Sequence, residues 1–581
     1  MSNRLVLGIL VLLIEPLFGA TKVLKYSEDG SPTTLDPVQS ATTYSNTLVT
    51  SVYDTLFEYK YLKVPYQLKP NLAVDLPTVS KDGKTYTYKI KKGVFYSDDE
   101  AFPGGKGREV VAEDFVYSLK RHFDTKNRSQ GSWLWRGKIV GLDDWKKKGS
   151  DYNQGVEGLK ALDKYTIQVK LVKPFPQLNY TFAMGFSAVV PHEAVKKYGK
   201  EISIHPVGSG PFILKEFNPQ KAVLVKNQKF RKEIFNIQNE GFDPTLHGNI
   251  GLEKLNGQVL PIVDRVEISF MKQRVSRWNS FNKGSEIQFS WVPNAQVDNV
   301  VATKDPVVLK KEYQDKFHSR ISPEFGFVYS GFNMSKSEFG YHPDPKQNEK
   351  NRALRCAVRN AFSWDQRVRR FYFGIGKPFS GIIPPNVEGY SDLGAESIEH
   401  NVKKAKKLLK DAGWNKDNLP VFEYSGVSSV QTTQFYEQMR GFLRKIGYPR
   451  KKVKFKRFAT FGDYNRAMKE KRLVFMAQGW GLDYPDAENL LQLFYGPNGS
   501  PGSNNMNFND PEYNKLYEEI SAMEHSPERT EKFKRMNKIL SDECVVIAGF
   551  SRMRIFMWHK NTIMYPNRSP HGNVFKYVDV L

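Results

Sequence analysis

The chain has 581 residues, of which 40% are hydrophobic, 13% aromatic and 25% charged, a composition that excludes a disordered or collagen-like chain. There are 86 Lys and Arg against 62 Asp and Glu, giving a net charge of +24, and the mean hydropathy of −0.52 excludes a polytopic membrane protein. With only two cysteines, Cys356 and Cys544, neither a many-disulfide scaffold nor a zinc domain built on cysteine ligands is possible.

The first twenty residues have the layout of a cleavable export signal. Arg4 provides the positive start, residues 5–14 form an uncharged apolar run, and Gly19 and Ala20 supply small residues before Thr21. That run is shorter than the roughly 20 apolar residues that span a bilayer. No cysteine follows it, so we expect a soluble periplasmic protein without a lipid anchor. The alternative is a buried N-terminal core segment.

The basic charge points to a solvated surface, with electrostatic steering of anionic partners as the alternative. No nucleic-acid motif is present, and we expect no nucleic-acid partner.

The first part of the chain favours strands and turns. Alternating polar and apolar residues predict strands at 85–90 and 166–171, and helical spacing predicts a helix over 113–122. A glycine-rich turn at 206–211 leads into a strand that begins at Phe212.

From about residue 350 the pattern changes to helices that alternate with short strands. Amphipathic spacing predicts three helices, over 353–362, 402–412 and 434–446. Short apolar strands are predicted at 453–455 and 473–477. This alternation predicts an α/β lobe with a partly parallel sheet.

Motifs of catalysis are missing from the sequence. It has no His pair at i, i+4, no G-x-S-x-G elbow, no P-loop and no dinucleotide fingerprint. Asp483 and Asp486 offer a candidate acid/base pair for a secreted hydrolase, although such pairs are common in loops. We expect no catalytic residue, no metal site and no cofactor.

The sequence leaves open whether the two cysteines are free thiols or form a disulfide. Cys356 lies on an apolar helix face, where buried inert thiols are usual. A disulfide to Cys544 is the alternative in an oxidising compartment, provided that the two residues meet.

Several separated segments together resemble extracytoplasmic solute-binding protein family 5, the oligopeptide- and dipeptide-binding proteins of peptide ABC transporters. The matching segments follow the family order: TLDP at 34–37, VYDTLFE at 52–58, PNLA at 70–73, VAEDFVYSLKR at 111–121, PVGSGPF at 206–212, LRCAVRNAFSWD at 354–365, GWGLDYPD at 479–486, and SNN and NDPEY at 503–505 and 509–513. The segment at 52–58 resembles a helix of the family. Each match is weak alone, but so many in order cover nearly the whole mature chain.

The resemblance implies an α/β fold, the two-lobed clamp of type II, cluster C periplasmic binding proteins, with an extra third domain. It places the signal peptide at 1–20, the extra domain at 59–203 and the second lobe at 286–549. The first lobe would combine three separate segments, 21–58, 204–285 and 550–581.

The resemblance also implies a mechanism. A short peptide would lie extended between the lobes of a monomeric receptor, which delivers it to ABC permease subunits. Asp483 would meet the α-amino group of the peptide, because a cleft that closes over an ammonium needs an opposite charge. Gly479, Gly481 and Leu482 would supply a strand edge, and Trp480 an aromatic wall.

Asp486 and Glu488 lie close to Asp483 and could share its acidic role, and Trp133 and Trp135 are further candidates for ligand contact. The family also includes binders of metal chelates, haem and glutathione, so a non-peptide ligand on the same fold is the alternative.

Overall fold

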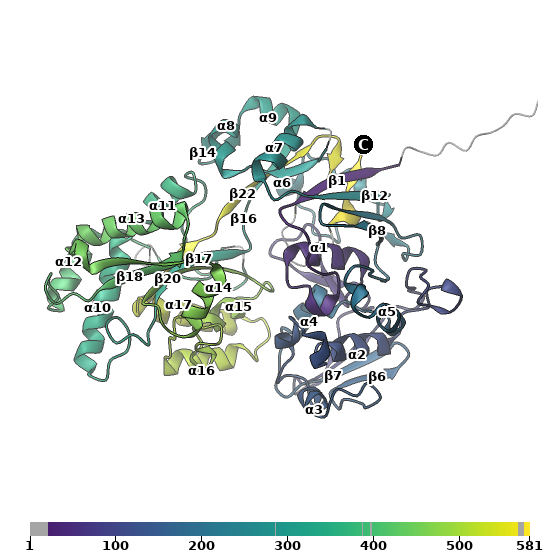
Figure 1. Cartoon of the computed structure of the whole chain (residues 1–581), viewed down its shortest axis with the longest axis horizontal. Coiled ribbons are helices and arrows are strands. Elements are labelled where there is room, and N and C mark those ends of the chain that lie inside the picture. The colour runs from purple at the N-terminus through teal and green to yellow at the C-terminus, as the bar shows by residue number, and fades with distance from the viewer. Residues whose placement is uncertain (1–20, 285, 386, 395–397, 567–573) are drawn as a thin grey trace, which may run out of the picture.

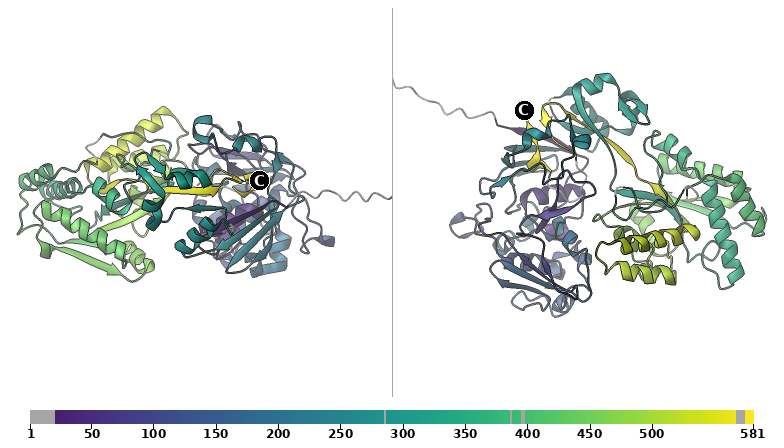
Figure 2. Two further views of the ribbon diagram at one scale, coloured as in Figure 1. Left: turned by 90° about the horizontal axis from the view of Figure 1, so that it is seen from above. Right: turned by 180° about the vertical axis from the view of Figure 1, so that it is seen from behind.

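The computed structural model describes residues 21–284, 286–385, 387–394, 398–566 and 574–581. The expected export signal at 1–20 lies outside the described residues. Figures 1 and 2 show two bodies joined by a third group of elements. We call them the N-terminal body, which extends along the chain from β1 (Val23–Glu28) to β12 (Arg265–Phe270), and the C-terminal body, which extends from β17 (Gly326–Phe332) to β21 (Val546–Phe550).

The first sheet of the N-terminal body brings together strands that are far apart in the sequence. Its order is β1 (Val23–Glu28), β12 (Arg265–Phe270), β9 (Lys221–Lys226) and β8 (Phe212–Phe217). β1 runs parallel to β12, and the other pairs are antiparallel. Leu24, Val266 and Leu224 are buried on this sheet, and α1 (Thr43–Val52) contacts β8.

The second sheet of the N-terminal body is wholly antiparallel. Its order is β4 (Thr78–Val79), β5 (Thr85–Lys89), β7 (Thr166–Lys170) and β6 (Leu159–Asp163). α2 (Ala112–Arg121) packs on β6 and β7, and the Asp114 carboxylate caps it by accepting from the Val111 N–H at 2.9 Å. The two strands and the helix predicted here are confirmed. Short helices α3 (Leu142–Lys147), α4 (Leu178–Thr181) and α5 (His192–Tyr198) complete this region.

One predicted element is wrong. Residues 52–58 do not form a helix, because α1 ends at Val52 and β2 (Phe57–Tyr59) begins five residues later, paired with β3 (Leu68–Pro70). Tertiary contacts decide this segment: the Asp54 carboxylate accepts from the Ser209 hydroxyl at 2.8 Å and from Arg231 Nη1 at 2.9 Å.

The C-terminal body is built on a mixed five-stranded sheet. Its order is β19 (Val453–Phe458), β18 (Phe422–Val427), β20 (Phe475–Gly481), β17 (Gly326–Phe332) and β21 (Val546–Phe550). β18 is parallel to both of its neighbours, while β17 is antiparallel to β20 and β21. The partly parallel sheet predicted for this lobe is therefore confirmed.

Helices surround this sheet. They are α10 (Pro345–Ala361), α11 (Trp364–Phe371), α12 (Val402–Asp411), α13 (Val430–Lys445), α14 (Phe461–Lys469), α15 (Glu488–Leu491), α16 (Pro511–Ile520) and α17 (Pro527–Asp542). Cys356 on α10 forms a disulfide with Cys544, just after α17, and the two Cα atoms are 5.1 Å apart. The bridge resolves the open question about the cysteines.

Two antiparallel strands connect the bodies. β16 (Phe317–Pro323) pairs with β22 (Met553–His559) over seven residues, and β13 (Phe289–Trp291) joins β22 on its other side. β16 leads into β17 and β21 leads into β22, so both connections cross at the same place, where Figures 1 and 2 show β22 running from one body to the other.

Smaller elements cluster near this crossing. They are α7 (Arg274–Lys283), α8 (Val297–Val300), α9 (Lys311–Lys316), β14 (Val301–Lys304) and β15 (Val307–Leu309). Within the described residues, no helix combines the length and apolar character needed to cross a membrane.

Candidate functional site

The segment 479–486 continues β20 and leaves one of its edges open. Gly479, Trp480 and Gly481 pair with β17, while β18 pairs with β20 only at Phe475 and Met476. No strand in the described part of the chain covers the opposite edge of the later residues. Both glycines are exposed.

The backbone of this edge is directed outward. The Tyr464 hydroxyl on α14 donates to the Ala477 carbonyl at 3.0 Å, from the side where α14 contacts β18. Backbone groups alternate in direction along a strand, so those of Gly479 and Gly481 point to the same side, away from β17. The edge therefore offers donors and acceptors to an added strand.

Asn489 holds two of the predicted site residues together. Its Oδ1 accepts from the Trp480 Nε1–H at 3.0 Å and from the Asp483 backbone N–H at 3.1 Å, while its Nδ2 donates to Asp483 Oδ2 at 3.1 Å. Asn489 lies on α15 and is buried. Asn489 was not predicted from the sequence. In the sequence, Asn489 is marked only by its amide side chain, which closely follows the motif and precedes two leucines.

The Asp483 carboxyl group sits in a site that disfavours its charge. Burial raises its pKa to about 6; the hydrogen bond from Asn489 lowers the pKa and the nearby charge of Glu488 raises it. A cation placed beside Asp483 would stabilise the ionised form.

Asp486 and Glu488 are engaged in structural contacts. Asp486 is 1% exposed and forms an ion pair with Arg529 at 2.9 Å. Glu488 is buried and accepts from the hydroxyls of Tyr484, at 2.6 Å, and Tyr517. With its carboxylate bound to a buried arginine, Asp486 does not fit the role of acid or base beside Asp483, so the geometry argues against the proposed hydrolase pair.

The remaining predicted site residues do not gather at the open edge beside Asp483. Leu482 is buried, and its N–H donates to the Phe325 carbonyl at 3.1 Å, so it does not extend the open edge. Trp135 is a correction: it is fully buried in the N-terminal body, where its Nε1–H donates to Thr181 Oγ1 at 3.0 Å, and it cannot touch a ligand between the bodies. Trp133 is 45% exposed and has no described contact with the motif.

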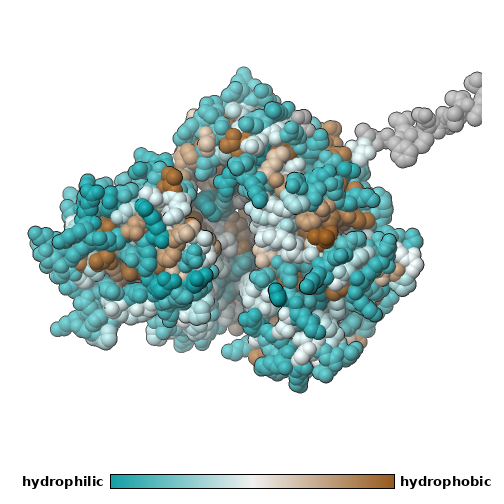
Figure 3. All heavy atoms as spheres, in the orientation of Figure 1, coloured by the Kyte–Doolittle hydropathy of each residue, from teal (hydrophilic) through white to brown (hydrophobic). Residues whose placement is uncertain are grey.

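Two residues of the N-terminal body contact this motif. Gln177 Nε2 donates to Asp486 Oδ2 at 3.1 Å, and the ring of Tyr180 stacks on that of Tyr484 with centroids 6.0 Å apart. Figure 3 shows the surface hollowed between the two bodies. The open edge and Asp483 thus belong to a region where two bodies joined by two strands face each other, which is the architecture of a clamp that closes on a solute.

Comparison with known proteins agrees with this class. A profile of the family described as "Bacterial extracellular solute-binding proteins, family 5 Middle" matches residues 67–502. The chain belongs to this family, which confirms the resemblance found in the sequence.

Relatives match over most of their length. The "Dipeptide-binding protein" of Escherichia coli (strain K12) is 25% identical over 555 residues, covering 93% of this chain and 92% of that protein. "Heme-binding protein A" of Haemophilus influenzae is 24% identical over 506 residues, covering 85% and 80%.

Solved structures show the same fold. The periplasmic binding protein DppA from Helicobacter pylori, in complex with peptide STSA, has a TM-score of 0.68 at 21% identity, with 96% of this chain and 98% of that chain covered. HbpA2 from Haemophilus parasuis has a TM-score of 0.75 at 18% identity, with 96% and 100% covered. The predicted α/β clamp of the type II periplasmic binding proteins is confirmed.

Proposed function

We propose that this protein captures short peptides outside the cytoplasm as the substrate-binding component of an ABC importer. One observation carries the proposal: the open edge at Gly479 and Gly481 leads directly to the partly buried carboxyl group of Asp483. An extended peptide can add to such an edge through its backbone, whatever its side chains. Its α-amino group would then meet Asp483 in a charge-assisted hydrogen bond.

The names of the relatives support a peptide ligand. The E. coli relative is named a dipeptide-binding protein, and the H. pylori structure contains the peptide STSA. Other relatives are named for haem and for glutathione, and these ligands are alternative outcomes of the binding test.

Two sheets of the N-terminal body support the proposed division of the chain, because β1, β12, β9 and β8 fall within the segments of the first lobe and β4 to β7 within the extra domain. The first lobe comprises 21–58, 204–285 and 550–581, the extra domain 59–203, and the second lobe 286–549. The protein acts as a monomer and passes its ligand to membrane permease subunits. Residues 1–20 direct export and are then removed, which N-terminal sequencing of the exported protein tests.

Calorimetric titration with di-, tri- and tetra-alanine tests the peptide proposal. We expect at least one of these peptides to bind, and N-acetylation of that peptide to abolish binding because the cation is lost. Asp483→Asn should weaken affinity by about 100-fold, since truncating one partner of a buried charge pair costs roughly 2–5 kcal/mol.

Asp315→Asn is the matched control, because Asp315 is an exposed residue of α9. Its affinity should equal that of the wild type. Equal affinity of the acetylated and free peptides, or unchanged binding by Asp483→Asn, would contradict the proposed role of Asp483.

A further inference from the structure

The hydroxyl of Tyr59 is buried close to the proposed site. Tyr59 ends β2 and is only 5% exposed, and within the described residues its hydroxyl has no hydrogen-bond partner. A buried polar group left unpaired is costly, so a partner is expected in the working state of the protein.

A stack of three tyrosine rings links Tyr59 to the motif. Tyr59 stacks on Tyr180 with centroids 6.5 Å apart and ring planes 13° apart. Tyr180 in turn stacks on Tyr484 at 6.0 Å and 7°. The stack therefore crosses from the N-terminal body to Tyr484, the residue that directly follows the Asp483 that we assign to the α-amino group.

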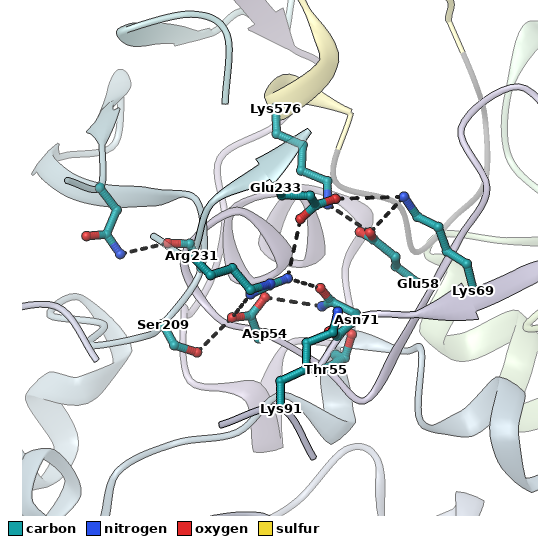
Figure 4. A network of polar contacts seen from close by, with 12 residues as sticks. Asp54, Thr55, Glu58, Lys69, Asn71, Lys91, Ser209, Arg231, Glu233 and Lys576 are labelled. Carbon is teal, nitrogen blue, oxygen red and sulfur yellow. Dashed lines mark hydrogen bonds and ion pairs between the residues drawn. The ribbon is translucent and has the colours of Figure 1, made fainter. Parts of the chain in front are cut away.

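A network of buried charges fixes the strand that carries Tyr59. Glu58, its neighbour, contacts Lys576 at 2.8 Å and Lys69 at 3.1 Å, and Figure 4 shows how these side chains converge. Successive side chains of a strand point to opposite faces, so the ion pairs of Glu58 hold Tyr59 with its ring turned away from the network. Its hydroxyl is therefore preorganised.

The chemistry of this hydroxyl selects its partner. Burial raises the pKa of Tyr59 well above its ordinary value, and the charge of Asp483 acts in the same direction. The phenol thus stays protonated and can donate one hydrogen bond. When a peptide is anchored by its α-amino group, the acceptor closest along its backbone is the carbonyl oxygen of its first residue.

We propose that Tyr59 donates its hydroxyl to the first carbonyl oxygen of the bound peptide, so that Tyr59 and Asp483 together recognise a free N-terminal residue. This inference rests on the proposed function. It explains how the hydroxyl can be buried in the working state of the protein, because the carbonyl oxygen of the ligand supplies its hydrogen-bond partner.

Tyr59→Phe tests the hydroxyl alone. We expect about tenfold weaker binding of the alanine peptide that binds the wild type most tightly, with an unchanged or higher melting temperature of the ligand-free protein, because an unpaired buried group is removed. Tyr448→Phe is the matched control, since Tyr448 is also buried, and its hydroxyl has no hydrogen-bond partner in the described part of the chain, but it lies in the core of the C-terminal body. Its affinity should not change.

A double-mutant cycle tests the acceptor. The same peptide with its first carbonyl oxygen replaced by sulfur, a weaker acceptor, should bind the wild type less tightly but should not lose further affinity for Tyr59→Phe. Wild-type affinity in Tyr59→Phe, or equal losses with the thio-peptide in both proteins, would overturn this inference. Failure of the wild type to bind any alanine peptide would instead overturn the proposed function.

Discussion

Two aspartates three positions apart acquire different roles from their surroundings. Asp486 is buried against Arg529 and belongs to the framework, whereas Asp483 is partly exposed and held by the neutral amide of Asn489. The resemblance in the sequence pointed to Asp483. It could not reveal Asn489, because which side chain orients a carboxylate depends on how α15 folds back on β20.

The raised pKa of Asp483 predicts a pH-dependent affinity. A ligand ammonium favours the ionised carboxylate, so binding should lower the pKa of Asp483 from about 6 and release a proton. Affinity should therefore rise with pH through about 6, and should fall about tenfold per pH unit well below it. Calorimetry at pH 5 to 7.5, in buffers of different ionisation enthalpy, measures both effects.

The same shift has the opposite effect on the stability of the empty protein. The folded-state pKa lies above the unfolded value of about 3.9, so the contribution of Asp483 to stability is present at low pH and is lost as pH rises through about 6.

An affinity that does not change between pH 5 and 7.5 would contradict contact between Asp483 and an ammonium group.

Asn489 should matter to both stability and binding. Asn489→Ala removes the partner of Trp480 and Asp483, and we expect a loss of about 1–3 kcal/mol in the free energy of unfolding. Peptide affinity should also fall, because the carboxyl group of Asp483 loses its fixed orientation. Urea denaturation and calorimetry measure the two losses. A variant that is less stable but binds like the wild type would show that Asn489 serves the fold alone.

At the scale of elements, the periodicity of apolar residues predicted strands and helices well, and tertiary contacts explain the one element that was predicted wrongly. The strands β5 and β7 and the helix α2 follow from local alternation and spacing. The segment after α1 does not, because Asp54 and Glu58 extend the chain by meeting cations from residues 231, 69 and 576. A local sequence pattern cannot reveal contacts with residues that are so far away along the chain.

The ion network around β2 should make the protein sensitive to acid. Burial raises the pKa of Glu58, but the charges of Lys576 and Lys69 outweigh it and hold the pKa well below its ordinary value. The stabilising contribution is therefore present above the unfolded pKa of about 4.3 and is lost as pH falls below it.

Glu58→Gln tests this contribution. It removes one of the carboxylates that Lys69 and Lys576 contact, while Glu233 and Glu240 remain. We expect a loss of about 1–3 kcal/mol in the free energy of unfolding at pH 7. The difference from the wild type should narrow below about pH 4. Urea denaturation across this pH range gives the comparison, and a difference that stays constant down to pH 3 would contradict the assignment.

At the scale of the whole molecule, the fold class was predictable from the order of weak motifs, while the strand pairing at the crossing was not. The paired strands β16 and β22 form because residues from 317 and 553 onward meet, a separation that no local pattern encodes. The exact domain boundaries stay a prediction.

The disulfide should stabilise the C-terminal body. It closes a loop between residues separated by 188 positions, and we expect its removal to cost about 2–5 kcal/mol. Urea denaturation of the double variant Cys356→Ala, Cys544→Ala measures this loss. Peptide affinity should not change, because the bridge joins α10 to the end of α17 rather than the segment 479–483. A large loss of affinity in a folded double variant would contradict this separation.

The central claim is that the cleft holds peptides by their N-terminal residue. Native mass spectrometry of protein purified without refolding, followed by release and fragmentation of the bound material, tests this claim most directly. We predict a mixture of short peptides that differ in sequence and share a free α-amino group. A single non-peptide mass, such as haem, would contradict the peptide assignment and remove the proposed roles of Asp483 and Tyr59.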